Sequence, residues 1–243
     1  MGVRFPIITA HSGCMDTTAH TLHSIETAIR LGADVVEEDV RVTRDGTPVL
    51  AHDDEWTAPD GRECRVSQMT LAEIRELQPL CTLEEMLLLI KASGKTANLD
   101  LKVDESIEPV AALVKKHDLL GNVFLSGCQK ERAMKVQRTH PELRKLLNVD
   151  ADLFLSKEYG AAMAQTCHDA KSAACFGINI NFQLVRRELM DYAAAEGLPV
   201  YVWTVDDEAV MKRFVELGAA SITARNVLPL IRLKSATESG LTP

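Results

Sequence analysis

The chain has 243 residues, of which 46% are hydrophobic, so it can bury a large core in one α/β domain or two small ones. A formal net charge of −8 and a pI near 5.4 argue against nucleic acid or an anionic membrane surface as the main partner. No apolar run is long enough for a signal-peptide core or for stable membrane insertion, so we expect a soluble, cytoplasmic protein. The six cysteines form no C-x-x-C pair, so we expect them to be free thiols.

Short β-rich runs alternate with longer helical patterns along the chain. Eight strand–helix units in a chain of this length predict a (β/α)8 TIM barrel, whose apolar strands fit a parallel sheet covered by helices. A doubly wound parallel sheet is the alternative. The eight predicted strands are residues 6–11, 34–40, 97–102, 122–127, 145–150, 177–181, 199–204 and 219–224.

The segments between these runs carry apolar residues at helical spacing. Residues 21–32, 82–94 and 207–218 are expected to form helices, and each ends in a glycine, a typical stop signal. No linker rich in Pro, Gly or Ser divides the chain, so we expect a single domain over residues 1–243. Residues 41–80 break the alternation: TRDGTP predicts a turn into an extra hairpin strand, followed by a short irregular insertion over the barrel mouth.

Polar residues gather where two successive barrel strands are predicted to end. Side chains two apart in a strand share a face, so Glu37 and Asp39 point the same way, and Glu38 points toward the helix layer or solvent. Asp100 and Lys102 share a face at the carboxyl end of the next barrel strand, where barrel enzymes build their active sites. Three converging carboxylates need raised pKa values or a bound cation, and oxygen ligands select Mg²⁺ or Ca²⁺.

Two histidines are predicted at the same rim. His11 ends the first strand, and His52 follows the TRDGTP turn back toward the barrel mouth. Two histidines beside a carboxylate-bound cation suit acid/base cleavage of a phosphoester, with the metal and Lys102 offsetting phosphate charge. The structural alternatives are surface or packing histidines, a plain salt bridge between Asp100 and Lys102, and core filling by Trp203.

Five motifs run nearly from end to end of the chain: ITAHSG, GADVVEEDVRVTRDGTPVLAHDDEW, CTLEEML, NLDLK and VYVWTVDD. In order, spacing and strand placement they resemble the signatures of the glycerophosphodiester phosphodiesterases, (β/α)8 barrels related to the phosphatidylinositol-specific phospholipases C. The site residues that the resemblance implies are the catalytic pair His11 and His52, the metal ligands Glu37, Asp39 and Asp100, and the substrate-binding residues Lys102 and Trp203.

Two positions depart from the family pattern. Ser12 stands where an arginine usually grips the phosphate, so the positive charge must come from elsewhere. Arg41, on the same strand face as the two acids, is the predicted substitute, and Ser12 is a further candidate for substrate binding. Ala19-His20-Thr21 replaces the expected Glu-Asn-Thr before the first helix, which adds a titratable histidine to the rim.

The resemblance implies metal-dependent hydrolysis of a small-molecule glycerophosphodiester to sn-glycerol 3-phosphate and an alcohol, with Mg²⁺ or Ca²⁺ as cofactor. Two alternatives stay open. A lysophospholipase D-like phosphodiesterase shares this chemistry and differs in its pocket. The second alternative is a barrel that binds a phosphate-containing ligand without turning it over. The departures from the family pattern at Ser12 and at Ala19-His20 favour this alternative. The preferred head group, the choice of metal and the oligomeric state stay open.

Overall fold

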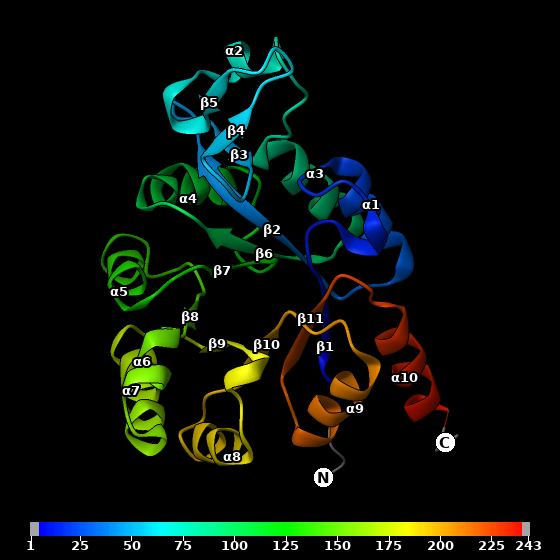
Figure 1. Ribbon diagram of the computed structural model, residues 1–243, viewed down its shortest axis with the longest axis vertical. Coiled ribbons are helices and arrows are strands. Elements are labelled where there is room, and N and C mark those ends of the chain that lie inside the picture. Colours follow the sequence, from blue (N-terminus) through cyan, green and yellow to red (C-terminus); the bar gives the residue numbers. More distant parts are fainter. Residues whose placement is uncertain (1–4, 240–243) are drawn as a thin grey trace.

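Eight parallel strands form a barrel in the computed structural model, which describes residues 5–239 (Figure 1). The barrel closes between β7 and β8, where the Leu125 N–H donates to the Arg144 carbonyl over 2.9 Å. All eight predicted strands are present, and closure excludes the doubly wound alternative. In spatial order the strands are β7 (Val123–Ser126), β6 (Thr96–Leu101), β2 (Val35–Val42), β1 (Ile7–Ala10), β11 (Ser221–Ala224), β10 (Val200–Trp203), β9 (Gly177–Asn181) and β8 (Leu146–Asn148).

Helices surround the barrel (Figure 1). Those predicted at 21–32, 82–94 and 207–218 are confirmed as α1, α3 and α9. Local signals set their ends: Thr82 and Glu85 form a reciprocal capping box at the start of α3. Within residues 5–239, no helix has the length and apolar character needed to cross a bilayer. The α-helices outside the segment after β2 are α1 (Leu22–Leu31), α3 (Leu83–Ser93), α4 (Ile107–Lys116), α5 (Lys130–Thr139), α6 (Ala151–Ser156), α7 (Tyr159–Ser172), α8 (Arg187–Ala195), α9 (Glu208–Leu217) and α10 (Leu228–Glu238), and the 3-10 turns there are η1 (Cys14–Asp16), η3 (Asp104–Ser106) and η4 (Phe182–Leu184).

The segment after β2 forms the projection at the top of Figure 1. β3 (Pro48–Leu50) pairs antiparallel with β2, which confirms the hairpin strand predicted from TRDGTP. The rest is more regular than predicted, because β4 (Glu55–Thr57) and β5 (Glu63–Arg65) pair as a separate hairpin. Two short helical elements follow, η2 (Val66–Gln68) and α2 (Leu71–Arg75).

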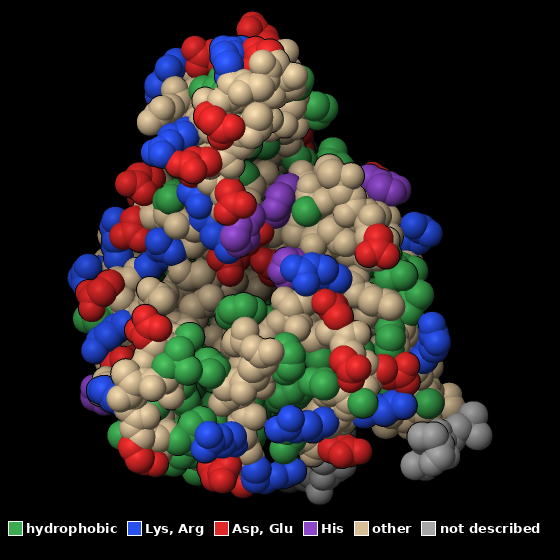
Figure 2. Space-filling model, viewed as in Figure 1, with side chains coloured by type: hydrophobic (Ala, Val, Ile, Leu, Met, Phe, Trp, Pro, Cys, Tyr) green, Lys and Arg blue, Asp and Glu red, His purple; other side chains and the backbone are tan. Residues whose placement is uncertain are grey.

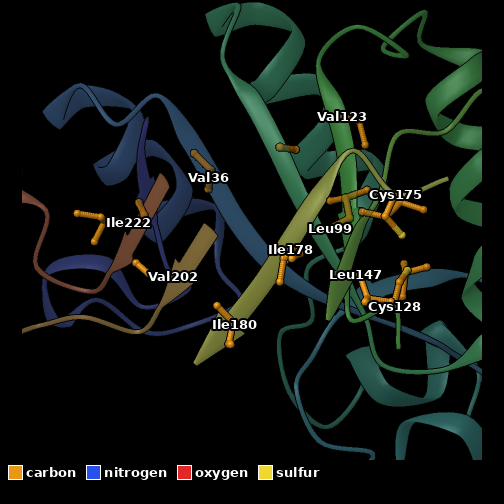
Figure 3. Close-up of a cluster of buried hydrophobic side chains, with 14 of the residues drawn as sticks. Val36, Leu99, Val123, Cys128, Leu147, Cys175, Ile178, Ile180, Val202 and Ile222 are labelled. Atoms are coloured by element: carbon orange, nitrogen blue, oxygen red, sulfur yellow. The ribbon is translucent and has the colours of Figure 1, made fainter. Parts of the chain in front are cut away.

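Successive residues along each barrel strand alternate between the helix layer and the barrel interior. One set of positions packs against the helices as the buried core shown in Figure 3, which includes Val36, Leu99, Ile180 and Ile222. The positions between them, such as Glu37, face the barrel interior. This alternation keeps the apolar contacts outside the barrel wall, and it leaves polar side chains inside the wall toward the carboxyl ends of the strands.

Aromatic rings fill the amino-terminal end of the barrel interior. Phe124, Phe176 and Tyr201 contact one another edge to face, with ring centroids 5.5 to 5.9 Å apart. Leu146 packs in the same cluster, and the Arg144 guanidinium lies 4.4 Å from the Phe176 ring centroid. Because this cluster occupies the base, the polar residues further along each strand lie at the opposite, carboxyl end.

Candidate active site

A cavity of about 1060 Å³ lies at the carboxyl ends of the barrel strands. Figure 2 shows acidic, basic and histidine side chains gathered in a hollow near the middle of this face. The fold therefore brings most of the predicted site residues to one place, although they come from five separate parts of the chain. The predicted residues that line the cavity are His11, Glu37, Asp39, His52, Asp100, Lys102 and Trp203.

The three acids meet because β2 and β6 pair in parallel, with Asp39 opposite Asp100. One carboxylate oxygen each of Glu37, Asp39 and Asp100 lies within 4.8 Å of the other two. Burial raises the pKa of Glu37 well above its ordinary value, and the charges of Asp39 and Asp100 raise it further. A bound cation would relieve the repulsion between these three carboxylates. A compact set of oxygen donors is the kind of site that Mg²⁺ and Ca²⁺ prefer.

Gly127, the residue after β7, allows Asp100 to occupy this position. Its φ is 68°, and a Cβ there would lie 2.5 Å from Asp100 Oδ1 and 2.4 Å from the Leu101 carbonyl oxygen. The Ser126 hydroxyl donates to Asp100 Oδ2 over 3.3 Å. The end of β7 therefore packs directly against the third acid, and the approach requires a residue without a side chain.

Lys102 places an ammonium group beside the acids. Its Nζ lies 2.8 Å from Asp39 Oδ1 and 3.1 Å from Asp100 Oδ1. Burial opposes its charge, but the two carboxylates outweigh burial and hold the pKa of Lys102 above its ordinary value. Lys102 thus keeps its positive charge directly beside the three acids.

His11 follows β1 and is half-buried. Its Nδ1 lies 2.9 Å from the Ser12 carbonyl oxygen and 3.8 Å from Glu37 Oε2. Burial lowers the pKa of His11; the Ser12 carbonyl opposes this shift, and the charge of Arg225 adds to it. With Nδ1 bonded to the backbone, Nε2 is the ring nitrogen left for proton transfer.

His52 follows β3 at the cavity rim, where its ring is largely exposed. Its Nδ1 lies 2.9 Å from Asp53 Oδ1, which orients the ring. The Arg41 Nε donates to the His52 carbonyl oxygen over 2.8 Å. Arg41, the predicted phosphate-binding substitute, thus contacts the backbone of this segment and is not among the residues that line the cavity.

Ser12 is also absent from the cavity lining among the described residues. It is buried, and its hydroxyl donates to Glu38 Oε2 over 2.8 Å and accepts from the His20 N–H over 2.9 Å. Glu38, for which the helix layer or solvent was predicted, is fully buried, so exposure to solvent is wrong.

Sequence reasoning missed several cavity residues. Arg225, one residue after β11, lines the cavity with His11, and no pattern in the sequence marked it. Asn98 and Asn179 also line it, and their alternation with apolar residues in β6 and β9 was a usable signal. Asn179 Nδ2 donates to Asn148 Oδ1 over 3.1 Å, so amides continue the polar interior away from the acids.

The chain matches the model of the glycerophosphoryl diester phosphodiesterase family over residues 11–227. It is also 25% identical, over 246 aligned residues, to a protein of Bacillus subtilis (strain 168) named glycerophosphodiester phosphodiesterase. That alignment covers 88% of this chain and 81% of the Bacillus protein.

Two solved structures share the fold. The glycerophosphodiester phosphodiesterase of Thermotoga maritima superposes with a TM-score of 0.79 at 19% identity, covering 95% of this chain and 99% of that one. A phosphodiesterase of Oleispira antarctica, solved with the product sn-glycerol-3-phosphate, gives a TM-score of 0.78 at 24% identity, covering 96% and 97%. Since the family match runs from the first cavity histidine to beyond the last barrel strand, the chain belongs to the glycerophosphoryl diester phosphodiesterase family.

Proposed function

We propose that the protein hydrolyses a glycerophosphodiester to sn-glycerol 3-phosphate and an alcohol, with a divalent cation and the pair His11 and His52. The observation that carries this proposal is that two histidines, three carboxylates and Lys102 line one cavity at the carboxyl end of the barrel. Family membership supports it, as does the sn-glycerol-3-phosphate bound to the Oleispira antarctica phosphodiesterase.

Glu37, Asp39 and Asp100 would hold the cation through their carboxylate oxygens. When bound, a divalent ion polarises a phosphoryl oxygen and offsets the charge that develops on it. Lys102 adds a positive charge directly beside the acids. Arg225 adds another at the cavity wall, where Arg41 was predicted to act.

The two histidines divide the proton transfers. A glycerophosphodiester carries a hydroxyl next to the ester, so this hydroxyl can attack the phosphorus and form a cyclic phosphate. One of His11 and His52 accepts the hydroxyl proton while the other protonates the leaving alcohol. When water opens the ring, the two exchange roles and sn-glycerol 3-phosphate is released.

Two residues of the cavity lining, Asn98 and Trp203, carry polar atoms of the kind that bind hydroxyl groups. Asn98 Oδ1 and Trp203 Nε1 are buried and have no hydrogen-bond partner within residues 5–239. The first can accept a hydrogen bond from a hydroxyl group, and the second can donate one. Buried polar atoms without partners are costly, so a ligand that satisfies them is favoured over an apolar one.

The test follows release of sn-glycerol 3-phosphate from glycerophosphocholine, glycerophosphoethanolamine and glycerophosphoglycerol, with Mg²⁺, Ca²⁺ or EDTA. We expect turnover with a cation and none in excess EDTA, and phosphorus NMR should detect the cyclic phosphate. His11→Ala and His52→Ala should each lower the rate by about 100-fold or more. His23→Ala, on the exposed side of α1, is the matched control and should keep wild-type activity.

The outcomes separate the candidate functions. Turnover of lysophosphatidylcholine without turnover of the soluble diesters would favour the lysophospholipase D-like alternative. Binding of sn-glycerol 3-phosphate without turnover of any diester would favour the binding-only barrel. Wild-type rates in both cavity-histidine variants would exclude the two-histidine mechanism.

A further inference from the structure

Ser12, His20 and Glu38 form a hydrogen-bonded network behind the acid cluster, and the proposed hydrolysis leaves it without a role. Glu38 is fully buried, and its Oε2 accepts from the Ser12 hydroxyl over 2.8 Å. His20 Nδ1 lies 2.9 Å from the same oxygen, and the His20 N–H donates to the Ser12 hydroxyl over 2.9 Å. His20 is therefore held both by its backbone and by its ring.

The other ring nitrogen of His20 points at a predicted cation ligand. His20 Nε2 lies 3.6 Å from Asp39 Oδ2, while Lys102 Nζ lies 2.8 Å from Asp39 Oδ1. Each carboxylate oxygen of Asp39 thus has a different nitrogen beside it. Because Asp39 is only 3% exposed, water has little room to replace either neighbour.

The backbone of His20 is in an uncommon conformation. Its φ is 60°, in the left-handed region, which costs a residue with a Cβ about 1–2 kcal/mol. Such a conformation persists where the surroundings fix it on both sides. Here the Ser12 hydroxyl bonds the His20 N–H on one side, and on the other Thr21 caps α1 by accepting from the Ser24 N–H. The loop thus fixes the backbone of His20, and the contact of Nδ1 with Glu38 fixes the direction of its ring.

We propose that His20, held by Ser12 and Glu38, is a positioning residue that fixes the carboxylate of Asp39 for binding a divalent cation. The proposal rests on the cation site of the proposed function. Residues behind a metal ligand set its orientation, and their loss commonly weakens metal affinity by about 10–100-fold. His20 would therefore act on the cation through Asp39, without touching the substrate.

Isothermal titration of the full chain with Mg²⁺ and with Ca²⁺, without substrate, tests the proposal. The main variant is His20→Asn, because asparagine tolerates a positive φ and its short amide can bond Glu38 without reaching Asp39. His20→Gln instead extends an amide toward the position of Nε2. We expect a cation Kd about 10-fold weaker in His20→Asn, a smaller loss in His20→Gln, and a wild-type Kd in His23→Ala.

A second measurement separates positioning from general packing. In thermal unfolding, a purely structural role lowers the Tm in EDTA and leaves the cation-induced rise in Tm unchanged, which would overturn the proposal. The proposal requires a smaller cation-induced rise in His20→Asn than in wild type. Equal cation Kd values in wild type and His20→Asn would overturn the inference alone. Absence of cation binding in the wild type would instead refute the metal-dependent function, and the inference with it.

Discussion

Replacing Gly127 by alanine tests how closely the wall of the barrel packs against the cation site. The added Cβ would lie 2.4 Å from the Leu101 carbonyl oxygen and 2.5 Å from Asp100 Oδ1, at a φ of 68°. Gly61 is the matched control, because it has a φ of 85° and an added Cβ there meets nothing within 4 Å. Both variants place alanine in the left-handed region, but only one of them creates a clash.

The expected difference in Tm between the two variants follows from this clash. A left-handed alanine costs about 1–2 kcal/mol in either variant, so this cost cancels in the comparison. Overpacking adds about 1–3 kcal/mol at Gly127 alone, since the backbone of Leu101 cannot turn aside as a flexible side chain can. At roughly 2–4 °C per kcal/mol for a chain of this size, Gly127→Ala should have a Tm about 2–12 °C below that of Gly61→Ala.

The assay is thermal unfolding of both variants, in EDTA and in saturating Mg²⁺ or Ca²⁺. Because the Cβ would also push on Asp100 Oδ1, the cation-induced rise in Tm should be smaller in Gly127→Ala than in Gly61→Ala. Equal Tm values and equal cation-induced rises in the two variants would refute the close packing inferred at this site.

Three further predictions concern charge in the cavity. Lys102→Ala should lower kcat/KM by about 100-fold or more, and by far more than Ser12→Ala, because it removes the ammonium beside the acids; unchanged steady-state kinetics would place the phosphate elsewhere. Arg225→Ala should raise KM about 10-fold, whereas Arg62→Ala in the projecting hairpin should not; equal KM values would remove Arg225 from the substrate site. Cation affinity should weaken as pH falls, because protons compete for Glu37, and the raised pKa of Glu37 makes this competition begin well above its ordinary value of 4.5. Titrations at about pH 5.5 and 7.5 check this, and equal Kd values would contradict it.

The sequence alone predicted the eight barrel strands and the shared face of the acids on β2 and β6, and it held a signal for Asn179 that was not used. Ile178 and Ile180 are buried in the core while Asn179 between them lines the cavity, and this period of two can be read from neighbouring residues. The meeting of acids from β2 and β6 was predictable for the same reason, because adjacent parallel strands end at the same rim. Capping residues likewise marked the ends of helices such as α3.

The hairpin of β4 and β5 escaped prediction because its strands pack little. Each has only three residues, with one half-buried residue between two exposed ones, and an alternation this short does not distinguish a strand from a loop. Their pairing is set by backbone hydrogen bonds within the projecting segment. A pattern of burial cannot reveal strands that are hardly buried.

Only the tertiary structure decided which groups at the rim are partners. Ser12 was a predicted candidate for substrate binding, and Glu38 was predicted to face the helix layer or solvent. In the folded chain the Ser12 hydroxyl instead donates a hydrogen bond to Glu38. Arg225 comes near His11 because β11 and β1, from opposite ends of the chain, are neighbours in the barrel. The direction of a side chain within a strand depends on residues next to it, so the sequence determines it. The partners of loop side chains depend on where loops from different strands meet, and only barrel closure sets that arrangement.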